Sequence, residues 1–205
     1  MNSKFDEKLC KQYPKIFAQR NMPVNQTAMC WGFQCGDGWY ALVDSLCFLI
    51  QTHIDYEHET FNKLVGWQKK HKILSFIHKV CYPLYTLCDK TRALPKEIKK
   101  CTQVVASTVK EKFGGLRFYV SGGDYVTESY IRFAEFMSNS ICENCGTTDG
   151  VEQTEGWIYT MCKSCLAAQK NELAERNKKL AKLIKRKTKN GASRGRSKAR
   201  RAKKA

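Results

Sequence analysis

The sequence predicts an α+β protein, with a mixed helical body that contains one β hairpin, a four-cysteine module and a basic C-terminal helix and tail. Three observations lead to this prediction. One segment has apolar residues at three- and four-residue spacing, a second has β-branched runs around a Gly-Gly pair, and a third has two Cys-x-x-Cys pairs. We expect a body over residues 1–140, a zinc-binding module over 141–168, a basic helix over 169–187 and a disordered basic tail over 188–205.

Charge is distributed unevenly along the chain. The 205 residues include 36 Lys and Arg and 19 Asp and Glu, which gives a net charge of +17. Residues 169–205 contain 16 basic and 2 acidic residues, so the rest of the chain carries only +3. No apolar run reaches the roughly 18 residues needed to cross a bilayer, and residues 1–15 do not have the apolar stretch of a signal peptide. We therefore expect a cytoplasmic protein without a membrane partner.

The first half of the chain is predicted to be helical. A short amphipathic helix is expected over residues 4–20, ending near Pro14. The segment Cys35-Gly-Asp-Gly-Trp39 predicts a turn with Asp37 as a helix N-cap. The helix that follows has an apolar face formed by Trp39, Leu42, Val43, Leu46, Cys47, Ile50 and Ile54. Residues 61–88 indicate one or two more helices that end at Pro83, and Pro95 opens a further element.

A hairpin is expected next, because β-branched runs from Gln103 to Phe113 and from Leu116 to Val120 flank Gly114-Gly115. With these two glycines as the turn, the paired residues are Phe113 with Leu116, Glu111 with Phe118 and Val109 with Val120. The alternative is a helix from Pro95 to Phe113 with Gly114 as its C-cap, but the density of β-branched residues favours strands. A helix is expected from about Tyr125 to Ser138.

One face of this hairpin is predicted to be basic, with Lys110, Lys112, Arg117 and Tyr119 opposite the apolar face. Cations beside an aromatic ring suit a surface that contacts phosphate and stacks a base. A solvated outer face with no ligand is the alternative for this patch taken alone.

Two cysteine pairs give the most specific signal in the chain. Cys142 and Cys145 form one Cys-x-x-Cys pair, and Cys162 and Cys165 form a second after a gap of sixteen residues. Two such pairs can place four thiolates around one tetrahedral Zn²⁺, and a closed four-cysteine site is structural. With the expected strand from Trp157 to Met161 and the helix that follows, the segment indicates a treble-clef or zinc-ribbon module. Disulfides and redox use of these cysteines are the less favoured alternatives.

The other cysteines have no metal-ligand spacing. We interpret them as thiols packed in the protein, although a second metal site, or a nucleophilic Cys35 beside Asp37, is an alternative. They are Cys10, Cys30, Cys35, Cys47, Cys81, Cys88 and Cys101. None of the four histidines lies in a zinc-hydrolase or deaminase motif, and none follows Cys142, which weakens an enzymatic interpretation.

The basic C-terminal segment indicates a nucleic-acid partner, DNA or RNA. Such blocks of like charge usually bind polyanions, and a solubility tail or an anionic membrane surface are the weaker alternatives. The expected contact residues in this segment are Lys178, Lys179, Lys182, Lys185, Arg186, Lys187, Lys189, Arg194, Arg196, Lys198, Arg200, Arg201, Lys203 and Lys204.

Four motifs are similar to those of a family of small proteins encoded by tailed bacteriophages. They are Cys35-Gly-Asp-Gly-Trp-Tyr40, the segment from Val109 to Tyr119, Gly122-Gly-Asp124 and Cys142-x-x-Cys145-Gly146. The resemblance covers roughly residues 13–165, and residues 56–100 and the basic tail depart from it. It implies a phage setting, and therefore the cytoplasm of a host cell, and it assigns no catalytic residue.

The function expected from these features is nucleic-acid binding with a structural zinc ion, in a host or phage nucleoprotein complex. One alternative is an enzyme acting on nucleic acid, a nuclease or a modifying enzyme, with Cys35 and Asp37 near the basic hairpin face. Another is a modulator that binds a host machine such as RNA polymerase or the ribosome.

Overall fold

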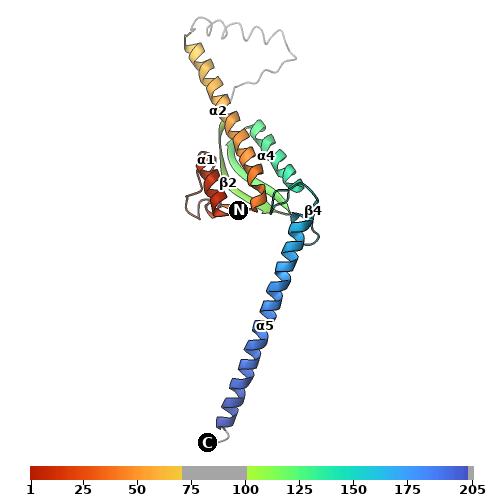
Figure 1. The fold of residues 1–205 in the computed structure, drawn as a ribbon. Coiled ribbons are helices and arrows are strands. Elements are labelled where there is room, and N and C mark those ends of the chain that lie inside the picture. Colours follow the sequence, from red (N-terminus) through yellow and green to blue (C-terminus); the bar gives the residue numbers. More distant parts are fainter. Residues whose placement is uncertain (71–100, 203–205) are drawn as a thin grey trace.

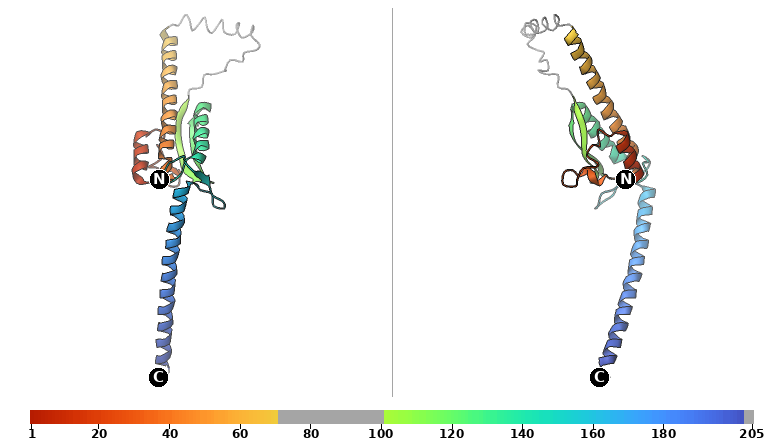
Figure 2. Two further views of the ribbon diagram at one scale, coloured as in Figure 1. Left: turned by 45° about the vertical axis from the view of Figure 1, so that its right-hand side comes forward. Right: turned by 90° about the vertical axis from the view of Figure 1, so that its left-hand side faces the viewer.

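The fold is seen in a computed structural model, which describes residues 1–70 and 101–202, with side chains for residues 1–63 and 101–184. Helices α2 (Tyr40–Lys70) and α4 (Tyr125–Met137) lie side by side over one face of a three-stranded sheet (Figures 1 and 2). The mixed helix and strand class expected from the sequence is confirmed. The elements predicted to end at Pro83 and to begin at Pro95 fall outside the described residues.

Helix α1 (Ser3–Gln12) begins where the Asn2 side chain accepts a hydrogen bond from the Phe5 backbone N–H, and it ends before Pro14. A 3-10 turn, η1 (Met29–Trp31), and a second, η2 (Asp37–Trp39), precede α2. Asp37 does not cap a helix as predicted. Its carboxylate instead accepts hydrogen bonds from the backbone and side chain of Asn2, at 2.6 and 2.7 Å. Asp37 therefore connects η2 to the start of α1.

The sheet has the order β1-β2-β3, with β1 (Phe33–Gln34) parallel to β2 (Thr102–Lys112) and β2 antiparallel to β3 (Gly115–Gly123). The hairpin is confirmed, and the helix considered as its alternative is excluded for residues 102–112. The predicted register is wrong, because the turn is formed by Phe113 and Gly114, with φ of 55° and 75°. Positive φ at both central residues is required by the type I′ turn, a common two-residue hairpin connection.

Because the turn falls one residue earlier than predicted, Glu111 pairs with Leu116 and Val109 with Phe118. This is a shift of two residues on the opposite strand, so each residue keeps its predicted face. Val109, Leu116 and Phe118 are accordingly buried, and Lys110, Lys112, Arg117 and Tyr119 stay together on the other face. Phe113, which was expected on the apolar face, is 68% exposed at the turn.

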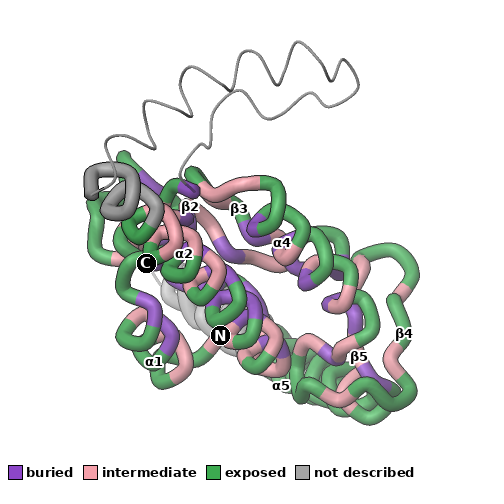
Figure 3. The backbone as a smooth tube through the Cα atoms, turned by 90° about the horizontal axis from the view of Figure 1, so that it is seen from above, coloured by how far each residue is buried: buried purple, intermediate pink, exposed green. Residues whose placement is uncertain are grey.

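The core lies where α2, α4 and the sheet meet, as the buried residues in Figure 3 show. Helix α4 starts with a capping box in which Asp124 and Thr127 bond each other's backbone, and it buries Ile131 and Ala134. The predicted apolar face of α2 is largely confirmed. Its fully buried members on α2 are Val43, Leu46, Cys47, Ile50 and Ile54, and Trp39, the last residue of η2, is also fully buried.

After α4 the chain forms a short 3-10 turn, η3 (Ser138–Ser140), a two-stranded antiparallel sheet of β4 (Val151–Gln153) and β5 (Thr160–Cys162), and then α5 (Lys163–Ala202). Helix α5 extends away from the body (Figure 1). It continues through Ala202, whereas the sequence favoured a disordered tail from residue 188. Gly191 and Gly195 weaken a helix by roughly 1 kcal/mol each relative to Ala, but Ala, Lys and Arg around them are strong helix formers.

Candidate metal centre and basic surfaces

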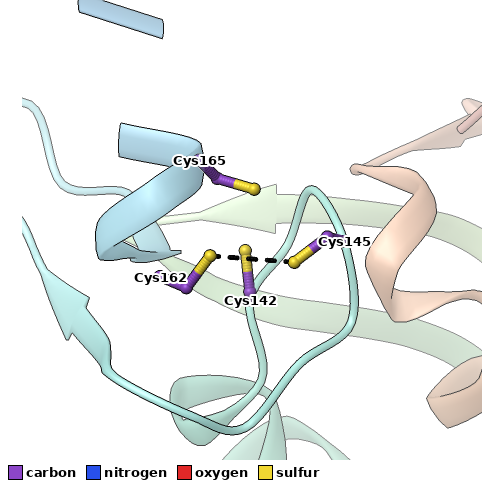
Figure 4. Close-up of side chains that lie close together, drawn as sticks. All are labelled: Cys142, Cys145, Cys162 and Cys165. Carbon is purple, nitrogen blue, oxygen red and sulfur yellow. Dashed lines mark hydrogen bonds between the residues drawn. The ribbon is translucent and has the colours of Figure 1, made fainter. Parts of the chain in front are cut away.

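Four cysteine sulfurs come together at the base of α5. Cys142 and Cys145 lie on the loop after η3, Cys162 is the last residue of β5, and Cys165 lies in the first turn of α5 (Figure 4). The four Sγ atoms lie within 4.8 Å of one another, and Cys145 and Cys162 are 3.7 Å apart. Thiolates on a tetrahedral zinc ion are about 3.8 Å apart, given a Zn–S bond of about 2.3 Å. The predicted ligand set is therefore brought together in a cluster that could hold a metal ion.

The turn between Cys142 and Cys145 is closed by the backbone. The Gly146 N–H donates to the Cys142 carbonyl at 2.8 Å, and Gly146 has φ of 81°, which a residue with a side chain rarely adopts. The Cys142 N–H donates to the Thr147 carbonyl, also at 2.8 Å. The sulfurs of Cys142 and Cys145 point toward each other, as Figure 4 shows.

Polar groups also surround the second cysteine pair. The Asn144 side-chain amide donates to Cys165 Sγ at 3.3 Å. Hydrogen bonds from the Ser164 hydroxyl and from the Cys165 backbone N–H lower the pKa of the Cys162 thiol to about 6. A thiolate is the form that binds a metal, and donors to sulfur help to hold its charge.

The Cys35–Trp39 segment holds the loop of Cys142 and Cys145 against the body. The Gly36 N–H donates to the Glu143 carboxylate and the Gly38 N–H to the Glu143 carbonyl, both at 2.8 Å. The Trp39 indole N–H donates to the Ile141 carbonyl at 2.9 Å. Sequence reasoning missed this role, because it treated residues 35–39 as a turn and a helix N-cap and not as a contact for residues 141–146.

The glycines of this segment are required by that close approach. A Cβ atom at Gly36 would collide with the Glu143 carbonyl oxygen, and one at Gly38 would collide with the Cys142 carbonyl oxygen and the Gly146 nitrogen. Backbone therefore packs directly on backbone at this interface. The sequence signal that could have indicated this close approach is the pair Gly36 and Gly38, separated by one residue and followed by Trp39.

The hairpin turn holds the other side of the module. The buried Thr160 hydroxyl donates to the Gly114 carbonyl, and a Cβ atom at Gly114 would meet the Ile158 side chain. The buried Ser138 hydroxyl accepts a hydrogen bond from the Leu116 N–H at 2.9 Å. The two glycine-containing motifs of the body thus hold the cysteine loop and strand β5 in place.

Cys35 does not have the environment of a nucleophile. It is only 6% exposed, and burial raises the pKa of its thiol to about 12, so the reactive thiolate is disfavoured. Asp37 is bonded to Asn2 and lies outside hydrogen-bonding contact with this thiol. The interpretation of Cys35 as a packed thiol agrees with its burial, and Cys47 is likewise fully buried.

The basic hairpin face is assembled as the sequence predicts. Lys110 and Arg117 are directly opposite each other on the paired strands, and Lys110 Nζ lies 6.0 Å from the centre of the Tyr119 ring, which is 44% exposed. Lys112 Nζ lies 5.2 Å from the Phe113 ring. Among the ion pairs between described residues, none involves these three cations. Facing like charges are unfavourable on a sheet, so an anion beside them would relieve their repulsion.

An aromatic hollow adjoins this face and was not predicted. It has a volume of about 350 Å³ and lies between the hairpin turn and the loop before β5, where Phe113 and Trp157 are among its lining residues. Trp157 is 76% exposed. The sequence placed Trp157 in a strand, but β5 begins only at Thr160, so its ring is free to project from the loop.

The part of α5 whose side chains are described is largely exposed. Residues 167–184 are all exposed, among them Lys178, Lys179 and Lys182. The other predicted contact residues from Lys185 to Arg201 continue along the same helix, and Lys203 and Lys204 lie outside the described residues. Leu173, Leu180 and Leu183 are also exposed, at 56%, 55% and 54%.

The fold and the site together define this chain as a mixed α+β protein with a four-cysteine cluster that could hold a metal ion. Comparisons of the chain with known protein families, curated proteins and solved structures find no match. No helix in the described part of the chain is long and apolar enough to cross a membrane.

Proposed function

We propose that this protein binds nucleic acid through α5, and that a structural zinc ion in the four-cysteine site fixes the start of that helix. One observation carries the proposal. Residues 169–205 contain 16 basic and 2 acidic residues. Helix α5 extends from the body to Ala202 and carries all of these residues except Lys203 and Lys204, and its residues 167–184 are exposed.

The dimensions of α5 suit a polyanion. At 1.5 Å per residue, its 40 residues extend for about 60 Å. Duplex DNA carries one negative charge for about every 1.7 Å of its axis, and each phosphate that a cation neutralises releases a condensed counterion. A helix with this charge and exposure can contact several phosphates in one binding event.

Zinc is the metal proposed for the four-cysteine site. Four thiolates favour zinc or iron–sulfur chemistry, and a closed tetrahedral set leaves no position for a substrate. A cysteine loop, the β4–β5 hairpin and a helix that carries the last ligand follow one another in the order of a treble-clef module. The ion would then couple the cysteine loop to the first turn of α5, so that the direction of the basic helix depends on metal.

The hairpin face and the aromatic hollow support a further contact with unpaired bases. Lys110, Lys112 and Arg117 can contact phosphate, and the exposed rings of Tyr119 and Trp157 can stack on bases. We assign affinity mainly to α5 and discrimination mainly to this face, because contacts to phosphate position a protein on nucleic acid without reading its sequence.

A second candidate function is binding to a protein, in a host or phage nucleoprotein complex or on a host machine such as RNA polymerase or the ribosome. The exposed leucines of α5 favour it, because Leu173, Leu180 and Leu183 form an apolar stripe at helical spacing. A partner helix or groove could cover that stripe while the cations contact nucleic acid.

One pair of variants tests whether α5 binds nucleic acid through its charges or through its leucines. The first variant lacks residues 171–205 but keeps Cys165, and the second changes Leu173, Leu180 and Leu183 to Ala and keeps every charge. Affinity for duplex DNA, single-stranded DNA and RNA is measured by fluorescence anisotropy at near-physiological salt. We expect the truncation to lose most of its affinity and the leucine variant to keep it. Equal affinity of the truncation and the full chain would refute the proposal.

A further inference from the structure

A second group of metal-ligand side chains lies at the N-terminal end of α4, whereas the cysteine loop follows the C-terminal end of that helix. His53 lies on α2, Cys101 immediately precedes β2, and Asp124 is the N-cap residue of α4. Their ligand atoms lie within 4.8 Å of one another, and His53 Nε2 is 2.8 Å from Asp124 Oδ2. Residues from three separate elements therefore converge on one point.

The three side chains are set at the edge of the core. Cys101 is 4% exposed, and the side chains of His53 and Asp124 are 15% and 33% exposed. Asp124 also lines a hollow of about 420 Å³ between β3 and α4, together with Gly123 and Thr127. A ligand at this group would be held mainly by protein and would remain next to a space that solvent can enter.

Hydrogen bonds to neighbouring residues hold Asp124 and Cys101 in place, and a ring contact supports His53. Asp124 Oδ1 accepts from the Thr127 N–H at 2.9 Å, which leaves Oδ2 directed at His53. His58 Nε2 is 2.8 Å from the Cys101 carbonyl oxygen and fixes that backbone, and the Tyr130 ring meets the His53 ring edge-on. Partners of this kind, one shell outside the ligands, orient the ligands of metal sites.

We propose that His53, Cys101 and Asp124 form a second zinc site, distinct from the four-cysteine site. One nitrogen, one thiolate and one carboxylate are ligands that zinc accepts, and three protein ligands leave one coordination position for water or another oxygen ligand. Ligand N and O atoms on a tetrahedral zinc are about 3.4 Å apart, so His53 Nε2 and Asp124 Oδ2, at 2.8 Å, need to separate by about 0.6 Å. Cys101 releases its proton when the metal binds.

This arrangement differs from the four-cysteine site in its chemistry. A closed set of four thiolates is structural, whereas three mixed ligands with an open position are typical of zinc that binds a water or a substrate oxygen. The proposal does not depend on nucleic-acid binding, and α5 can be removed without altering these three residues.

Equilibrium dialysis of the full chain against buffered micromolar free Zn²⁺ tests the proposal, with metal and protein measured in the same samples. We expect two zinc ions per chain for the unchanged protein and one for Cys101→Ser and for His53→Gln. Cys47→Ser, a buried cysteine on α2 outside both groups, is the matched control and should keep two. Circular dichroism identifies any variant that fails to fold.

Cobalt substitution gives an independent readout. A second equivalent of Co²⁺ should add absorption typical of a site with one thiolate ligand, and this increment should vanish in Cys101→Ser and persist in Cys47→Ser. The same metal content in Cys101→Ser and His53→Gln as in the unchanged protein would overturn the proposal and leave the trio as a hydrogen-bonded contact.

Discussion

The cysteine module and helix α5 adjoin each other but are built on different principles. The module is held by individual contacts: backbone packs on backbone at Gly36 and Gly38, and buried hydroxyls bond at Ser138 and Thr160. In α5, by contrast, residues 167–184 are all exposed, and what distinguishes the helix is its charge. Single substitutions should therefore disable the module, whereas only the removal of many charges should disable α5.

The largest effect is expected from Cys145→Ser. Structural zinc sites bind their ion with roughly 10–16 kcal/mol, and this energy is also folding energy. We expect the variant to lose the metal of the four-cysteine site and to unfold residues 141–166, while the rest of the body stays largely folded. Metal analysis and thermal unfolding measure both effects. Cys30→Ser, outside the cluster, should retain metal and stability.

Gly38→Ala should destabilise the module without altering any ligand. The added methyl group meets the backbone of Cys142 and Gly146, which cannot rotate away, and overpacking of this kind costs about 1–3 kcal/mol. Gly115→Ala is the matched control, since its methyl group meets mainly the end of the flexible Arg117 side chain. In denaturant unfolding, the free energy of unfolding should be clearly lower for Gly38→Ala than for Gly115→Ala. Equal free energies of unfolding would show that the close approach is unimportant.

Ser138→Ala should have an effect of the same sign and of similar size. It removes the acceptor of the buried Leu116 N–H, and a buried donor left without a partner costs about 1–3 kcal/mol. The measurement is the free energy of unfolding in urea. Ser129→Ala, which removes an exposed hydroxyl on α4, provides the comparison and should change stability little. A loss in Ser138→Ala no greater than that in Ser129→Ala would argue against a role for this bond.

The smallest effect should come from the hairpin face. Changing Lys110, Lys112 and Arg117 together to Gln should weaken nucleic-acid binding less than the loss of α5, because three cations are replaced. Tyr119→Ala should matter mainly for single strands, where stacking of one base contributes about 1–3 kcal/mol. Titrations with single-stranded and duplex oligonucleotides distinguish these cases. A loss equal to that of the α5 truncation would place the main binding surface on the hairpin.

The same contrast explains what the sequence could predict. Local signals were sufficient for the four-cysteine cluster, the helix after Trp39 and the hairpin, because spacing and periodicity are properties of short segments. The predicted hairpin register was wrong because Phe113 adopts positive φ in the turn. Phenylalanine rarely adopts positive φ, so the sequence favoured the two glycines as the turn residues.

Contacts between distant segments could not be predicted. The role of Gly36 and Gly38 depends on a loop more than a hundred residues away, and the convergence of His53, Cys101 and Asp124 depends on three elements. No periodicity encodes such contacts. The sequence also did not predict where α5 ends, because Gly191 and Gly195 favour disorder while the residues around them favour a helix.

The salt dependence of binding tests the central claim most directly. Each phosphate contact on duplex DNA contributes about −0.9 to the slope of log affinity against log salt concentration. If the segment from Lys178 to Lys204 contacts about eight phosphates, the slope should be about −7. The chain without residues 171–205 should bind weakly and show a much shallower slope. The claim is contradicted if the truncated chain binds duplex DNA as tightly as the full chain and with the same slope.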